Sequence, residues 1–135
     1  MLTLEEIYFK NTYEVVLSSD QLLLFSLENL IDNHFFDRSF AIITASNPRN
    51  TLLSNRENER QNALLYSELN SNNVLHARGC YEEHCEDGYL IFNTTLPDAL
   101  LLGRKYEQVS IFYNDSKKLM YVDCKSGKII VVISR

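Results

Sequence analysis

The sequence predicts an α+β fold, in which two or three helices pack on a mainly antiparallel sheet. Three observations favour this fold. Residues 40–45 form a continuous apolar run, which is typical of a strand that is covered on both faces. A helix-start signal follows at Ser54. The last part of the chain alternates short apolar segments with short polar separators, which indicates strands joined by hairpins.

The length of the chain predicts one domain over residues 1–135. This length is too short for two ordinary domains. The hydrophobic share of 45% and the charged share of 23% are globular values, so we expect one hydrophobic core.

The formal net charge of -5 disfavours binding to the negatively charged backbone of a nucleic acid, so we do not expect a nucleic-acid partner. Arg49, Arg56 and Arg60 lie close together in the sequence, either as a local basic patch or as the solvated start of a helix. No segment approaches the roughly 20 apolar residues that cross a bilayer, so no membrane span is expected. The N-terminus lacks the pattern of a secretory signal, and three cysteines are an odd number. These features predict reduced thiols and a cytoplasmic location.

The first forty residues allow several interpretations. Residues 2–11 suit a short helix, which Thr3 can cap with Glu6 three positions later. Residues 12–17 alternate like a strand but could also extend that helix. Residues 18–36 offer either a helix or a short strand through residues 22–27.

The remaining elements are more clearly marked. Pro48 ends the first core strand, and the sequence SNRE at Ser54 forms a capping box for a helix that should end near Leu69. A second helix is expected at residues 96–106, with Pro97 in its first turn. The other predicted strands are 74–80, 89–93, 108–114, 118–124 and 128–134, and a polar hairpin or loop is expected at 81–88.

The helix that begins at Ser54 carries amides where apolar side chains are expected. Leu65 and Leu69 mark its buried stripe, and the same stripe continues backwards through Asn62 and Asn58. A buried amide without hydrogen bonds costs about 1–3 kcal/mol for each unmet group. The two asparagines therefore either hold the preceding loop against the helix, or they line a polar pocket with Thr44 and Asn47 at the end of the strand.

This segment resembles a bacterial family, the domain of unknown function numbered 3293. The family has a core strand with TAxNP, then LS, then a helix with two asparagines four residues apart. The matching residues here are Thr44, Ala45, Asn47, Pro48, Leu53, Ser54, Asn58 and Asn62.

Three further positions extend the resemblance, which covers residues 40–113. The family carries a glycine and then an acidic residue before a short strand, and Gly79 and Glu86 match these. It also has FGQ ahead of a closing strand, where this chain has YEQ, so Gln108 matches and Glu107 replaces the glycine. The resemblance implies a fold and a site but no reaction.

Cysteine and histidine side chains gather at His76, Cys80, His84 and Cys85. They could bind zinc, or Cys80 could act as a nucleophile beside a histidine. Because no standard zinc spacing is present and His84 directly precedes Cys85, ordinary loop residues are the favoured interpretation, and we predict no metal and no cofactor. Cys124 is expected in the core. The acidic residues at 82–87 are typical of a solvated hairpin, and only Glu86 gains support from the resemblance.

We therefore predict that the chain binds a small polar or anionic molecule. The predicted ligand-binding residues are Thr44, Asn47, Asn58, Arg60, Asn62 and Gln108, with Glu86 as the candidate catalytic acid or base. Arg60 or the helix N-terminus would favour a negative group. Two alternatives stay open: a small enzyme that uses Glu86 in the same pocket, and a protein-interaction module with a Tyr- and Phe-rich surface and no pocket.

Overall fold

The computed structural model describes residues 2–30 and 34–135 of the chain. Its strands form one antiparallel sheet in the order β2-β1-β4-β5-β3-β6-β7-β8. These strands are β1 (Thr12–Ser18), β2 (Gln21–Phe25), β3 (Phe40–Ile43), β4 (Val74–Tyr81), β5 (His84–Phe92), β6 (Ser110–Asn114), β7 (Lys118–Asp123) and β8 (Ile129–Ser134). The helices are α1 (Leu4–Lys10), α2 (Asn55–Ser67) and α3 (Leu96–Lys105). The predicted α+β fold is confirmed.

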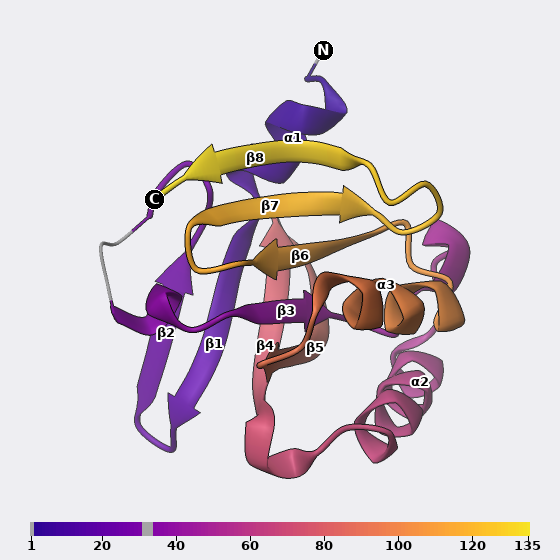
Figure 1. Ribbon diagram of the computed structural model, residues 1–135. Helices are drawn as coiled ribbons and strands as arrows, with labels where there is room; N and C mark the ends of the chain where they lie inside the picture. The colour runs from indigo at the N-terminus through magenta and orange to yellow at the C-terminus, as the bar shows by residue number, and fades with distance from the viewer. Residues whose placement is uncertain (1, 31–33) are drawn as a thin grey trace.

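The sheet curls strongly. In Figure 1, β1, β2, β4 and β5 run steeply across the view, whereas β3, β6, β7 and β8 run almost horizontally. Tyr13 of β1 and Tyr121 of β7 are distant in the strand order, yet their ring centroids lie only 6.2 Å apart. The face that they share is therefore the concave face. It holds an aromatic core that includes Phe25, Phe40 and Phe112.

The opposite, convex face of the sheet is covered in part by α2 and α3. Its core contains Ile43 and Ile111 from the sheet, Leu65 from α2, and Ala99 from α3. Figure 1 shows α3 in front of β3 and β6. The four residues of β3 are all buried, because this strand lies between β5 and β6 and has a core on each face. This confirms the prediction of a strand covered on both faces.

The helix-start signals act as predicted. Thr3 and Glu6 form a capping box at α1, and Ser54 and Glu57 form one at α2. Pro97 lies in the first turn of α3. Each signal works because it satisfies backbone N–H groups that have no partner inside the helix.

The structure decides between the open interpretations of the first forty residues. Residues 12–17 belong to β1, in which Tyr13 and Val15 alternate with more exposed neighbours. The strand interpretation also holds for residues 21–25, which form β2. The alternative helix through residues 18–36 includes positions 31–33, which lie outside the described residues.

The segment expected as a polar hairpin or loop at residues 81–88 is mostly strand. Pairing between β4 and β5 continues to Tyr81 opposite His84, so only Glu82 and Glu83 form the turn. Glu82 adopts φ 55°, which lets two residues reverse the chain. A 9-residue β5 replaces the short strand that was expected at 89–93.

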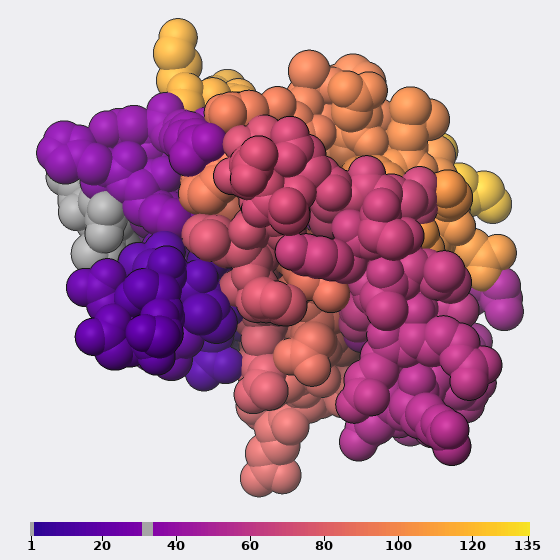
Figure 2. All heavy atoms as spheres, turned by 90° about the horizontal axis from the view of Figure 1, so that it is seen from below, coloured from indigo at the N-terminus to yellow at the C-terminus, as the bar shows by residue number. Residues whose placement is uncertain are grey.

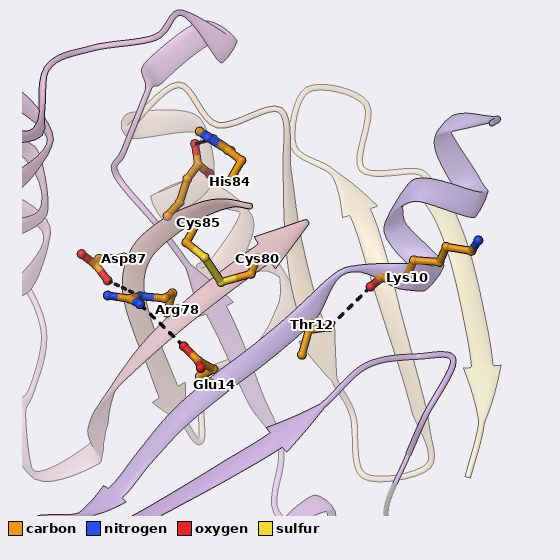
Figure 3. Close-up of a disulfide and its surroundings, with 9 residues drawn as sticks. Lys10, Thr12, Glu14, Arg78, Cys80, His84, Cys85 and Asp87 are labelled. Carbon is orange, nitrogen blue, oxygen red and sulfur yellow. Dashed lines mark hydrogen bonds and ion pairs between the residues drawn. A yellow bond between two sulfur atoms is a disulfide. The ribbon is translucent and has the colours of Figure 1, made fainter. Parts of the chain in front are cut away.

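The prediction of reduced thiols is wrong for two of the three cysteines. Cys80 and Cys85 lie directly opposite each other in β4 and β5 and form a disulfide, as Figure 3 shows. Cys124 is free and buried, as expected for a core residue, and burial raises the pKa of its thiol to about 11. The cytoplasmic location stays a prediction. None of the described helices has the length and apolar character that a membrane span requires.

Candidate functional site

The loop that follows β3 is held by the side chain of Asn62, which lies on the buried face of α2. Its Oδ1 accepts a hydrogen bond of 2.8 Å from the backbone N–H of Ala45. Its Nδ2 donates to the Ser46 hydroxyl at 2.9 Å and to the Asp87 carbonyl at 3.1 Å. A single amide therefore joins α2, the end of β3 and β5.

Asn47 forms a second junction, with Asn58, which lies one helical turn before Asn62 on α2. Its backbone N–H donates to Asn58 Oδ1, and its Oδ1 accepts from Asn58 Nδ2 and from the backbone N–H of Leu53. Its Nδ2 donates to Oε2 of Glu86 at 2.7 Å. Asn47 thus connects the start of α2 to the carboxylate of Glu86 on β5.

The backbone of this loop is unusual. Asn47, Arg49 and Asn50 have φ angles of 47°, 58° and 57°, in the left-handed region. Asparagine tolerates this region better than most residues, but three such positions within four residues carry local strain. The amide contacts of Asn47 and Asn58 hold this conformation.

The close approach of β5 to the end of β3 also shapes the site. A Cβ atom at Gly88 would lie 2.5 Å from the Ile43 carbonyl oxygen, so only glycine fits. Beside it, the Thr44 hydroxyl donates to the Asp87 carbonyl at 2.6 Å and accepts from the Ser46 N–H. Gln108 closes the loop from the other side, because its Nε2 donates to the Ser46 carbonyl at 3.0 Å.

A cavity of about 250 Å³ lies at one end of the concave face, and we call it the inner cavity. Side chains alternate along a strand, so Glu86 and Gly88 face the same side as the buried Leu90. Four predicted residues line this cavity: Thr44, Asn47, Glu86 and Gln108. They come from the loop after β3, from β5 and from the segment before β6, and the pairing of β3 with β5 and β6 brings them together.

A second, open depression of about 1100 Å³ lies between α2 and the convex face of β4 and β5, and we call it the outer groove. Figure 2 shows the β4–β5 hairpin projecting beside the segment that contains α2. Asn58 and Asn62 line the outer groove, whereas Asn47 and Glu86 line both spaces. The hydrogen bond between Asn47 and Glu86 therefore forms part of the wall between them.

Glu86 is the group in this wall with unused hydrogen-bonding capacity. Its Oε2 accepts from Asn47, and His84 Nε2 lies 3.8 Å from the same oxygen. Among the described residues, none donates a hydrogen bond to Oε1. The side chain is 30% exposed, so water or a ligand can reach it.

The sequence did not single out several polar residues of the inner cavity. The Ser110 hydroxyl donates to the Tyr8 hydroxyl at 2.7 Å, and Asn11 Nδ2 donates to the Tyr121 hydroxyl at 3.3 Å. All four line the cavity. The tyrosines carried no positional signal in the sequence, and the first forty residues lie outside the family resemblance. Only the pairing of β1 with β4 would have indicated that this segment reaches the site.

Arg60 lies apart from the inner cavity. It is exposed on α2, and within residues 2–30 and 34–135 it shares no hydrogen bond or ion pair with the network. Glu86 is the only Asp, Glu, Lys or Arg among the described residues that line the cavity. The cavity thus presents a carboxylate, and the prediction that Arg60 binds an anionic group gains no support from its position.

The cysteine and histidine cluster is divided between the two faces of the hairpin. His84 lines the inner cavity beside Glu86, whereas His76, Cys80 and Cys85 lie on the convex side. Figure 3 shows the disulfide next to Arg78, which forms ion pairs with Glu14 and Asp87. His76 packs with the rings of Tyr66 and Tyr89. The disulfide occupies both sulfur atoms, so Cys80 has no free thiolate for the nucleophile hypothesis. In the part of the chain that the structure describes, no group of three or more His, Cys, Asp or Glu side chains could hold a metal ion.

Comparison with known proteins adds a family but no activity. Residues 43–111 match the family model described as "Protein of unknown function (DUF3293)", which spans slightly more than half of the chain. The matched region runs from the end of β3 to the start of β6 and includes the network of asparagines, Glu86 and Gln108. No curated protein and no solved structure was found to match the chain.

Proposed function

Because the chain belongs to the DUF3293 family, whose description assigns no activity, we propose from the site itself that the protein binds a small polar molecule in the inner cavity. The observation that carries this proposal is the position of Glu86. Asn47 fixes one carboxylate oxygen at the wall of the cavity, and no described residue donates a hydrogen bond to the other oxygen.

The roles of the predicted residues divide into two groups. The side-chain amides of Asn58 and Asn62 form hydrogen bonds with other parts of the protein, so these two residues position the loop. The other predicted site residues line the cavity, and we propose that they contact the ligand: Thr44, Asn47, Glu86 and Gln108. The hydroxyls of Tyr8 and Ser110 belong to the same lining. This arrangement of a few convergent polar groups on an apolar lining is typical of small-molecule sites.

A fragment screen followed by ¹H–¹⁵N NMR tests this function. The fragments should include amines, carboxylic acids and neutral molecules of similar size. We expect at least one fragment to shift the backbone amide signals of Thr44, Glu86 and Gln108 together, because these residues surround one cavity.

A filled-cavity variant is the control for the screen. Ser110→Leu places a larger side chain in the inner cavity, and Ser67→Leu makes the same change at the exposed end of α2. Binding should be lost in Ser110→Leu and retained in Ser67→Leu. The proposal is wrong if no fragment shifts these signals, or if the shifts survive in Ser110→Leu.

Catalysis at the same cavity is the second candidate function. Glu86 favours it, because it is the one carboxylate among the described lining residues and its position is fixed. A fixed carboxylate in a cavity can act as a general acid or base. The test needs a substrate that is developed from a bound fragment. A much lower turnover rate of Glu86→Asp than of the wild type, at a saturating concentration of this substrate, would support catalysis.

A further inference from the structure

We propose that the natural ligand of the inner cavity carries a positively charged amino group, which pairs with Glu86 beside the ring of Tyr8. This inference rests on the proposed function and adds the chemical class of the ligand. It also replaces the anionic ligand that the sequence suggested.

The charges around the cavity favour a cation. Glu86 contributes a carboxylate, and the described lining contains no lysine or arginine. The basic side chain in the described lining is His84, whose Nε2 lies 3.8 Å from Oε2 of Glu86 and leaves Oε1 open to a ligand. An anion placed here would be repelled by the carboxylate, whereas an ammonium group would be attracted to it. The chain as a whole has a formal net charge of -5, which acts in the same direction at longer range.

The hydrogen-bonding capacity of Glu86 fits an ammonium group. An ionised carboxylate only accepts hydrogen bonds, and one of its oxygens has no donor within the described chain. An ammonium group carries three donors and accepts none. It can therefore bond to the free oxygen of Glu86 and still donate to neighbours such as the Gln108 side-chain oxygen or the Thr44 hydroxyl, which line the same cavity.

The aromatic wall supplies a second feature that suits a cation. The rings of Tyr8 and Tyr121 have their centroids 4.4 Å apart, and both residues line the cavity with Tyr13. Cations bind over aromatic rings, with the strongest attraction where water is excluded. Burial is the main cause that raises the pKa of Tyr8 above 10.0, and the charge of Glu86 contributes in the same direction, so the Tyr8 hydroxyl stays neutral at pH 7.

The size of the cavity limits the ligand to a compact molecule. Its volume of about 250 Å³ lies below the range of about 300–1,000 Å³ that is typical of drug-sized ligands. The cation is organic in this proposal, because the described residues offer no cluster of three metal-binding side chains. A small primary amine with an apolar body would match both the carboxylate and the tyrosine rings.

Three probes of almost equal size and different charge test the inference: benzylamine, benzyl alcohol and benzoate. Each would be titrated at pH 7 into the wild type, Glu86→Gln and Glu83→Gln, with Kd read from ¹H–¹⁵N NMR shifts. Glu83 lies on the same hairpin and is exposed, but it does not line the inner cavity, so it controls for the loss of one negative charge.

We expect benzylamine to bind the wild type at least about tenfold more tightly than the other two probes. Glu86→Gln should weaken benzylamine by about tenfold and leave benzyl alcohol unchanged, whereas Glu83→Gln should bind all three like the wild type. Equal or stronger binding of benzoate or benzyl alcohol in the cavity would overturn the amine inference and leave the proposed function intact. An unchanged Kd of benzylamine in Glu86→Gln would likewise overturn the amine inference and leave the proposed function intact. Failure of all three probes, and of every fragment in the wider screen, would overturn both proposals.

Discussion

Asn62 connects three parts of the chain through one amide, although a leucine would fit the pattern of its helix face better. It is 7% exposed and bonds to the backbone of Ala45 and Asp87. We predict that Asn62→Leu lowers the free energy of unfolding by about 2–3 kcal/mol, because the buried N–H of Ala45 loses its acceptor. Urea denaturation would measure the change.

Two variants of the same helix serve as comparisons for Asn62→Leu. Asn55→Ala alters an exposed residue and should change the stability by less than about 0.5 kcal/mol. Asn58→Leu should give an intermediate loss, since Asn58 is only half-buried and the described hydrogen bonds of its side chain all go to Asn47. Equal stability of Asn62→Leu and the wild type would show that the network does not hold the loop.

Residue patterns predicted this network but not the complete cavity. Asn58 and Asn62 could be found because they interrupt an apolar stripe of known period. Glu86 could be found only through the family resemblance, because its neighbours are also acidic. Tyr8 and Ser110 could not be found, since tyrosine suits both a core and a site, and their contact spans 102 positions of the chain.

At the scale of elements, α3 depends on a glycine near its C-terminal end. A Cβ atom at Gly103 would lie 2.6 Å from Cys124 Sγ and 3.0 Å from Ile111 Cγ2, so the helix packs directly on the sheet there. Alanine has a higher helix propensity by about 1 kcal/mol, but overpacking a core costs about 1–3 kcal/mol. We predict that Gly103→Ala destabilises the protein by about 1 kcal/mol in urea denaturation.

A double variant separates packing from helix propensity in this experiment. Cys124→Ala removes the sulfur atom that a new Cβ would meet, so Gly103→Ala should cost less in the Cys124→Ala background than in the wild type. Leu101→Ala, at a position of α3 that is 61% exposed, should change the stability little. A gain in stability for Gly103→Ala alone would show that the contact is not limiting.

Elements with strong local signals were predictable, and elements defined by pairing were not. The capping boxes at Ser54 and Thr3 identified two helix starts, since each depends on residues three positions apart. In contrast, the start of β5 at His84 depends on pairing with β4. The polar composition of residues 81–88 gave no sign of this pairing. The resemblance found in the sequence implies a glycine where Glu107 stands, and Glu107 adopts φ 55°, a conformation that suits glycine.

At the scale of the whole molecule, the curl of the sheet creates the site. The sequence predicted an antiparallel sheet, but the order of the strands depends on β3 pairing with both β5 and β6. Local patterns carry no information about such distant pairs. The curl places α1 and β1 beside β7, and this closes one wall of the inner cavity with Tyr8, Asn11 and Tyr121.

Tyr121 is the residue at which the two ends of the curled sheet meet. It is 2% exposed, its ring packs against Tyr8, and its hydroxyl accepts a hydrogen bond from Asn11 Nδ2. We predict that Tyr121→Phe lowers the free energy of unfolding by about 1 kcal/mol, because Asn11 loses its acceptor. Amide hydrogen exchange should become faster in α1 and in the first residues of β1, which that contact holds against the rest of the sheet.

Tyr113→Phe is the matched control, because Tyr113 is also buried and its hydroxyl donates to the Thr94 carbonyl at 2.8 Å. It deletes the same atom on the convex face, so the stability loss should be similar. The faster exchange should then appear at residues 94–98, where α3 begins, and not in α1. If both variants change exchange in the same regions, the closure of the sheet does not depend on the contact between Asn11 and Tyr121. The wall of the inner cavity would then be stabilised by other contacts, such as the ring packing of Tyr8 on Tyr121 and the hydrogen bond from Ser110 to Tyr8.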